Sequence, residues 1–167
     1  MRGLLSPAQN TVGAFILNWC TAVHLKINIF AWRTELDRIP TRQALFKRKV
    51  NINSVCCPLC SKNVESVEHL FTSCFYATML WGYISTWCKI PPMYVFSVRD
   101  ILKLREAILE DTKKRKAFEV IILVALWSIR KLRNKVVFGG KRVVLWRLYE
   151  ERKCTSYSCS IVEHMET

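Results

Sequence analysis

Apolar residues recur along most of this chain at spacings of three and four, which is the period of an amphipathic helix. The clearest stripe keeps this rhythm for about five turns and consists of Phe118, Ile122, Ala125, Ile129, Leu132 and Val136. Gly139-Gly140 follows and is a suitable C-terminal cap. Alternating segments joined by an Asn-Gly-type turn, which would indicate a β-hairpin, are missing. The pattern therefore predicts a mainly α-helical protein.

Four shorter helices are predicted upstream. The segment 20–37 has an apolar stripe with two cations on another face: Leu25, Ile29, Trp32 and Leu36, with Lys26 and Arg33. Thr41 is a plausible N-cap for a short basic helix over 42–49, and Ser97 for a helix that runs through Ile108. Between these two lies a third stripe, made of Tyr76, Leu80, Tyr83, Ile84 and Trp87. We expect each stripe to face the core.

A chain of 167 residues fits one ordinary domain, or one core with appendages. Pro91-Pro92 is the only obvious internal boundary in the sequence. We expect a metal-binding domain over 15–90 and a helical, basic C-terminal extension over 91–167. The last part of that extension, 141–153, is a basic amphipathic segment.

Cysteines and a histidine between the predicted helices have metal-ligand spacing. Cys57 and Cys60 flank Pro58-Leu59, and a tight turn brings two such sulfurs close enough to bind one ion. His69 and Cys74 follow on an apolar run. Three thiolates and one imidazole are the Cys3His set of structural zinc sites, and four protein ligands leave no position for a reactive water. We expect one Zn2+ that stabilises a loop in a small helical domain.

The sequence leaves two points about this site open. Cys56 adjoins Cys57, so either could be the first ligand, although Cys57 leaves the two-residue gap that zinc turns prefer. His69 and Cys74 are five residues apart, which is about 140° around an ideal helix, so one straight helix cannot present both to one metal. The helix that carries His69 must therefore end or tighten near Thr72-Ser73, with Cys74 at a break.

Eight cysteines could also suggest a secreted disulfide scaffold. However, the first residues lack a hydrophobic stretch of the length that a signal peptide needs. The longest apolar run, Val120 to Trp127, is far too short to cross a bilayer. We therefore expect reduced, metal-binding thiols in the nucleus or the cytoplasm, and no membrane partner. A thiol redox enzyme is disfavoured, because its Cys-x-x-Cys motif would normally follow a strand of a βαβ unit.

The chain is strongly basic, since Lys and Arg exceed Asp and Glu by 13. From Thr112 to Lys153 there are thirteen basic residues against three acidic ones. Such surfaces attract phosphate backbones with little sequence preference, and nearby aromatic side chains would suit RNA or single-stranded DNA. The candidate contacts are Lys113, Lys114, Arg115, Lys116, Arg130, Lys131, Arg133, Lys135, Lys141 and Arg142. The alternative is a solvated helix face on a basic protein.

Catalytic constellations are missing from the sequence. The aspartates, Asp37, Asp100 and Asp111, are isolated from one another, whereas two-metal chemistry needs clustered carboxylates. No glycine-rich phosphate loop appears, and His24 and His164 have no convincing nucleophile partner. We expect no autonomous catalysis and no small-molecule substrate.

Several motifs occur in a specific order along the chain. They are Lys26-Ile27-Asn28-Ile29-Phe30-Ala31-Trp32-Arg33, Ile39-Pro40-Thr41-Arg42, Cys57-Pro58-Leu59-Cys60, Val67-Glu68-His69-Leu70-Phe71, Cys74 and Trp81. Over roughly residues 15–85 this set resembles the reverse-transcriptase zinc-binding domain of plant LINE-type, non-LTR retrotransposon polyproteins. Downstream, Trp127-Ser128-Ile129 and Arg133 to Phe138 resemble the Trp…Arg-Asn…Phe helix that often follows it. Arg130 stands where that family tends to carry a second Trp.

The resemblance implies a nucleic-acid-associated, non-catalytic module of a retroelement protein, which helps to hold the RNA template or the target DNA. In intact elements the polymerase and the endonuclease lie upstream, so the resemblance implies a truncated or domesticated remnant. The competing interpretation is a zinc-stabilised helical domain that binds another protein and whose charge serves solubility.

Overall fold

The computed structural model of the chain describes residues 19–108 and 111–139. Its helices are α1 (Leu25–Glu35), α2 (Arg42–Lys47), the π-helical turn η1 (His69–Ser73), α3 (Phe75–Trp87), α4 (Val98–Ile108) and α5 (Thr112–Gly139). These described ranges contain no β-strand, but one isolated antiparallel bridge joins Cys56 and Val64. The prediction of a mainly α-helical fold is confirmed.

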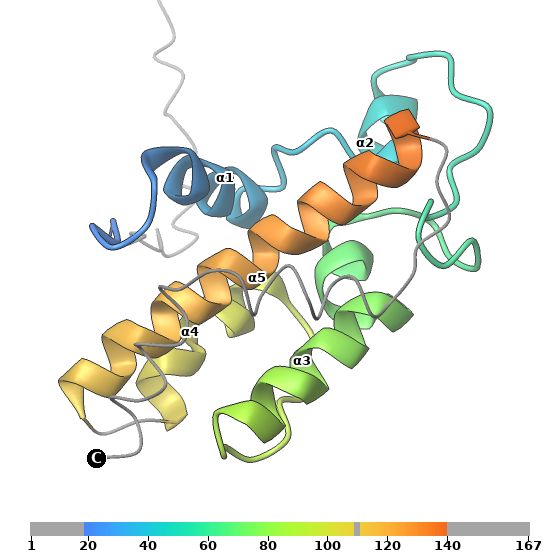
Figure 1. Cartoon of the computed structure of the whole chain (residues 1–167). Helices are drawn as coiled ribbons and strands as arrows, with labels where there is room; N and C mark the ends of the chain where they lie inside the picture. The colour runs from blue at the N-terminus through green and yellow to red at the C-terminus, as the bar shows by residue number, and fades with distance from the viewer. Residues whose placement is uncertain (1–18, 109–110, 140–167) are drawn as a thin grey trace, which may run out of the picture.

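The long helix α5 is the central element (Figure 1), and α1, α3, α4 and η1 all contact it. Its predicted stripe faces inward, because Phe118, Ile122, Ala125 and Ile129 are buried and Leu132 and Val136 pack against the same core. The helix is longer than the stripe. Gly139 is its last residue and not a cap beyond it, and Gly140 lies outside the described residues, as does the predicted segment 141–153.

The predicted core face of α1 is wrong. The stripe of Leu25, Ile29, Trp32 and Leu36 is exposed, and the neighbouring row of Ile27, Phe30, Ala31 and Thr34 is buried instead. Both rows have the helical period, so the choice depends on what the helix packs against. Phe30 decides it, since its ring contacts the rings of Phe71 and Trp127 edge to face.

Helix α1 also starts later than predicted, at Leu25 and not at Cys20. The buried side chain of Asn28 explains the difference. Its Oδ1 accepts a hydrogen bond from the Cys20 amide over 3.0 Å, and its Nδ2 donates to the Cys20 carbonyl over 2.9 Å. These bonds hold residue 20 in a turn outside the helix, where helical hydrogen bonds are replaced by side-chain ones.

The predicted caps of two short helices are confirmed. The Thr41 hydroxyl accepts from the Ala44 amide over 3.2 Å at the start of α2. Ser97 and Asp100 bond each other's amides at the start of α4, which is a capping box with Asp in place of Glu. Helix α2 ends at Lys47, two residues before the predicted end, and Lys49 already has a left-handed φ of 58°.

The helices on both sides of Pro91-Pro92 share one hydrophobic core. Trp81 and Ile84 of α3 belong to the same buried cluster as Ile101 of α4 and Leu126 of α5. The position of the metal segment follows from this arrangement, because η1 packs between α3 and α5.

None of the helices in the described part of the chain is long and apolar enough to cross a membrane.

Candidate metal centre

The first arm of the centre is a tight turn over Cys57 to Cys60. The Cys57 amide donates to the Asn63 carbonyl over 2.7 Å, and the Ser61 amide donates to the Cys57 carbonyl over 2.8 Å. Ser61 takes a left-handed φ of 57°, which reverses the chain toward the bridge at Val64. The turn therefore places the Cys57 and Cys60 side chains on one side of the loop.

The second arm is η1, which solves the spacing problem of His69 and Cys74. The Cys74 amide donates to the His69 carbonyl over 2.8 Å, a bond between residues five apart as in a π-helix. The helix ends at Ser73 and Cys74 is extended, as predicted. Of the two alternatives, an end or a tightening near Thr72-Ser73, the structure shows the end, and the turn before it is widened. A wider turn carries five residues close to one full turn, so both side chains reach the same side.

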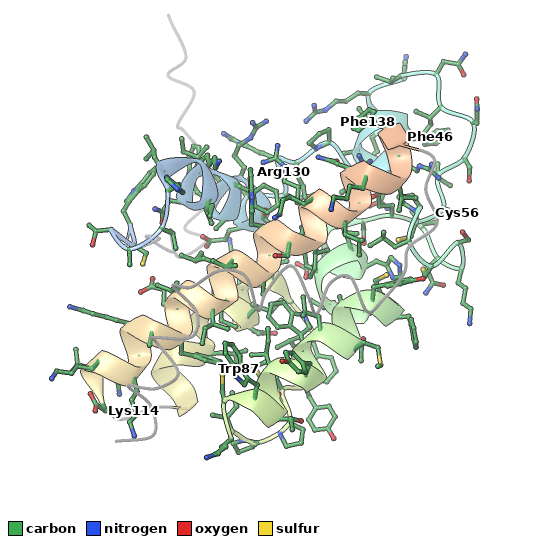
Figure 2. All side chains as sticks on the ribbon, in the orientation of Figure 1. Phe46, Cys56, Trp87, Lys114, Arg130 and Phe138 are labelled. Carbon is green, nitrogen blue, oxygen red and sulfur yellow. The ribbon has the colours of Figure 1, made fainter. Side chains whose placement is uncertain are left out.

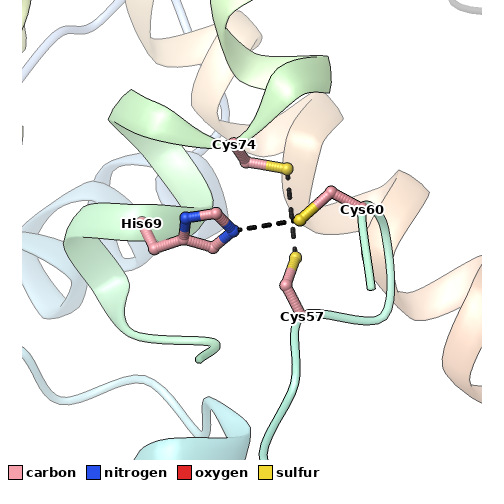
Figure 3. Close-up of side chains that lie close together, drawn as sticks. All are labelled: Cys57, Cys60, His69 and Cys74. Carbon is pink, nitrogen blue, oxygen red and sulfur yellow. Dashed lines mark hydrogen bonds between the residues drawn. The ribbon is translucent and has the colours of Figure 1, made fainter. Parts of the chain in front are cut away.

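The four predicted ligand atoms converge in the structure (Figure 3). The sulfurs of Cys57 and Cys74 are 3.9 Å apart, and the Cys60 sulfur is 3.3 Å from His69 Nε2. All four atoms lie within 4.8 Å of one another. Zinc–sulfur bonds of about 2.3 Å in a tetrahedron would separate two sulfurs by about 3.8 Å. The set fits one zinc ion.

Cys56 lies outside this group, so the geometry favours Cys57 as the first ligand. Its sulfur is not among the four converging atoms. Its backbone serves a different contact, since the Cys56 carbonyl accepts a hydrogen bond from Arg42 Nη1 over 2.8 Å. Figure 2 shows Cys56 on the loop between α2 and η1.

Neighbouring groups orient the His69 ring. Its Nδ1 lies 3.2 Å from the Ser73 hydroxyl, so Nε2 is left to face the sulfurs. The Ser66 hydroxyl accepts from the His69 amide over 3.0 Å and caps the helical turn. Neither serine was predicted from the sequence, although Ser66 three residues before His69 is a recognisable cap signal.

Burial and shared protons shift the pKa values of the ligands. The pKa of Cys57 is raised, first by its hydrogen bond to Cys74 and then by burial, whereas accepting that bond lowers the pKa of Cys74. Burial lowers the pKa of His69 and outweighs the opposing effect of the Glu65 carboxylate. The imidazole is therefore neutral near neutral pH, which is the form that binds a metal ion.

Backbone amides prepare the sulfurs for negative charge. The amides of Cys60 and Leu59 partly oppose the rise in the pKa of Cys57, and the Tyr76 amide in the first turn of α3 adds to the lowering of the pKa of Cys74. Thiolates at such positions are stabilised, because the N–H dipoles point toward them. A Zn2+ ion bound here would be held by three thiolates and one imidazole, and would close the loop onto η1.

Two acidic side chains fasten the metal segment to the helices. Glu65 is fully buried and pairs with Arg133 of α5, at 2.8 Å from Nε to Oε1, and its Oε2 accepts from the Arg42 amide over 2.7 Å. Glu68 Oε2 accepts from the Val98 amide at the start of α4 over 2.8 Å. Neither contact was predicted from the sequence, since an isolated carboxylate in a polar loop normally indicates solvent exposure.

The predicted nucleic-acid residues do not form one patch. Lys113, Lys114, Arg115 and Lys116 lie in the first turns of α5, whereas Arg130, Lys131 and Lys135 lie on its C-terminal half. Lys114 and Arg130 are sixteen residues apart on one helix, which is about 24 Å, and Figure 2 shows this separation. Arg133 leaves the set because it is buried against Glu65. Lys141 and Arg142 lie outside the described residues.

Together the fold and the site define a small helical domain with a structural zinc site. Residues 3–81 match the family described as zinc-binding in reverse transcriptase. The matched range contains all four ligands, so the comparison supports the same domain that the motifs predicted. Comparisons with curated proteins and with solved structures found no match to the chain.

Proposed function

We propose that this protein is a non-catalytic zinc-binding module of a plant LINE-type retroelement protein, and that it binds RNA or single-stranded DNA as an accessory to reverse transcription. It would act where such nucleic acid is found, in the nucleus or the cytoplasm. The observation that carries the proposal is the convergence of Cys57, Cys60, His69 and Cys74, within a range that matches a reverse-transcriptase zinc-binding family.

The basic charge supports a nucleic-acid partner. The net charge of +13 favours association with polyanions. Lys113 and Lys116 are exposed in the first turns of α5. The N-terminal end of a helix dipole is positive, so cations there do not stabilise the helix and instead add to the positive potential of this surface. This positive potential attracts phosphate groups.

A salt titration tests the proposal. Retardation of a labelled single-stranded oligonucleotide should weaken steeply with salt, with a log-log slope of about 0.7 per phosphate contact. The variant K113Q/K114Q/R115Q/K116Q should reduce this slope. The variant K47Q/R48Q/K49Q/K62Q removes the same number of cations elsewhere, all of them exposed, and should reduce it less. Absence of retardation at low salt would contradict the proposal.

One observation favours a second candidate function, binding to another protein. The exposed stripe of α1 (Leu25, Ile29, Trp32 and Leu36) is apolar over three turns, and Trp32 is 42% exposed. Exposed apolar rows of this kind commonly contact other proteins. Salt-insensitive capture of a partner that is lost in W32A, without retardation of nucleic acid, would favour this function.

A further inference from the structure

A pocket of about 290 Å3 lies between α1 and α5, outside the metal centre. Three cations line it, Lys26 and Arg33 from α1 and Arg130 from α5. Lys26 and Arg33 are seven residues apart on the helix, so they lie on one face. Figure 2 shows Arg130 on the part of α5 next to α1. The pocket therefore collects positive charge from two elements that are remote in sequence.

Within the described part of the chain, no carboxylate lines this pocket and none of these three cations forms a salt bridge. Arg133 also reaches it, but Glu65 neutralises that guanidinium. Burial lowers the pKa of Arg130, and so does the nearby charge of Arg33. Like charges crowded around a hollow repel one another, and an anion between them would relieve that repulsion.

Aromatic rings hold Arg130 in place. Its guanidinium carbon lies 4.8 Å from the centre of the Phe30 ring and 4.6 Å from that of Trp127. Cation–π contacts of this kind fix the side chain without neutralising it. Arg130 is therefore oriented in advance and still carries its full charge toward the pocket.

The rest of the pocket wall suits a nucleobase. Asn134 and Phe138 follow Arg130 at intervals of four residues along α5, and both line the pocket. The Asn134 amide can bond a base edge, and the Phe138 ring is 81% exposed at the rim. A volume of about 290 Å3 is small among ligand pockets. It suits one phosphate and one base more than a large cofactor.

We propose that this pocket binds one nucleotide unit of a single-stranded RNA or DNA, with the phosphate between Lys26, Arg33 and Arg130 and the base stacked on Phe138. The proposal rests on the proposed function and adds a second contact site to the cations at the start of α5. A single strand is the expected partner, because only an unpaired base can turn out of its stack and enter a pocket.

The charge part of the site is tested with K26Q and R33Q, since both side chains are exposed and their loss should leave the fold intact. Each variant should bind labelled oligouridylate several-fold more weakly and lower the log-log salt slope by about 0.7. The matched control is K131Q, which removes one exposed cation from the next position after Arg130. Its effect should be clearly smaller.

The stacking part is tested with F138A, and F96A is the control because it removes a phenyl ring of similar exposure, 84% against 81%. F138A should weaken binding to oligouridylate by roughly 5- to 150-fold, the range found for base stacking. On an abasic oligonucleotide of the same length, F138A and the unsubstituted protein should bind equally. F96A should have no effect on either probe.

The outcomes separate this proposal from the proposed function. If the unsubstituted protein binds oligouridylate but K26Q and R33Q behave like K131Q, the pocket is not the site, although nucleic-acid binding stands. If F138A weakened binding to the abasic oligonucleotide as much as binding to oligouridylate, Phe138 would not stack on a base. Tighter binding to duplex DNA than to the single strand would overturn the pocket as the binding site. No binding by the unsubstituted protein would overturn both proposals.

Discussion

Arg133 and Glu65 are 68 positions apart in the chain and form a buried, bidentate ion pair. Arg133 Nε donates to Oε1 over 2.8 Å, and Nη2 donates to Oε2 over 3.1 Å. Glu65 is fully buried and also accepts the Arg42 amide. One carboxylate thus joins the metal-binding segment, the start of α2 and the C-terminal half of α5.

Replacement of Arg133 by Met should therefore destabilise the protein strongly. Removing one partner of a buried ion pair leaves the other charge buried and unpaired, which costs about 3–5 kcal/mol. Guanidinium unfolding of the zinc-loaded protein measures the change. The control K131M alters an exposed cation two residues earlier and should change the free energy of unfolding by no more than about 0.5 kcal/mol.

The double variant E65Q/R133M checks the cause of that loss. If R133M lowers the free energy of unfolding because the Glu65 carboxylate stays buried and unpaired, the neutral glutamine of the double variant should restore a large part of that free energy, since no charge then stays buried. Losses of the two single variants that simply add up would contradict a direct ion pair.

Removal of the metal should open the segment from Val55 to Cys74 first. Few of its side chains are buried apolar ones, so burial hardly offsets the entropy of ordering it. Zinc can add on the order of 10 kcal/mol in small modules. Hydrogen exchange with and without chelator should show deprotection there and in α1 and α3, while most of α5 stays protected.

The structure predicts deprotection at two further sites. Chelation should also expose the Val98 amide, which Glu68 holds, and the turns of α5 around Arg133, which Glu65 holds. Uniform deprotection of the whole chain would indicate one cooperative unit. Unchanged protection from Cys57 to Cys74 would show that the segment does not need the metal.

Acidification should weaken the folded, zinc-loaded protein through His69. Burial holds its pKa below the ordinary value of about 6.5. The His69 imidazole therefore takes up a proton more readily in the unfolded chain than in the folded one. Its contribution to the free energy of unfolding is fully present above about pH 6.5 and is lost as the pH falls below that value. Urea unfolding across this range should show the slope. H69Q should reduce the slope, and an unchanged slope in H69Q would contradict the prediction.

The isolated chain should not polymerise or cleave nucleic acid. The structure gives its aspartates separate local tasks: Asp100 caps α4, Asp111 accepts from the Lys113 amide at the start of α5, and Asp37 lies in a turn with a φ of 52°. Magnesium-dependent catalysis needs such carboxylates side by side. Magnesium-dependent nucleotide incorporation by pure protein, abolished by D37N, D100N or D111N, would contradict this expectation.

Local signals in the sequence predicted the caps and the four side chains that converge at the candidate metal centre. Cys57 to Cys60 and the Thr41 cap depend on residues a few positions apart, and such short-range geometry follows from residue type and spacing. Even the break at Cys74 follows from helical spacing alone. Only its form differed, because a π-helical turn depends on how the surrounding core holds it.

Long-range relationships could not be predicted in the same way. Two rows of α1 have the same helical period, and the packing of Phe30 on Trp127 selects the row that is buried. Arg133 looks like one more cation of a basic helix, but the buried Glu65 removes it from the surface. Which cations stay accessible is decided by tertiary contacts and not by the sequence pattern.

The most direct test of the metal centre is zinc content per chain in freshly purified protein and two variants. The unsubstituted protein should contain one zinc. C57S should lower the stoichiometry, because Cys57 is one of the four converging ligands, and C56S should leave it intact, because Cys56 lies outside the group. A loss in C56S without one in C57S would move the ligand, and full zinc occupancy in both variants, or none in the unsubstituted protein, would contradict the site.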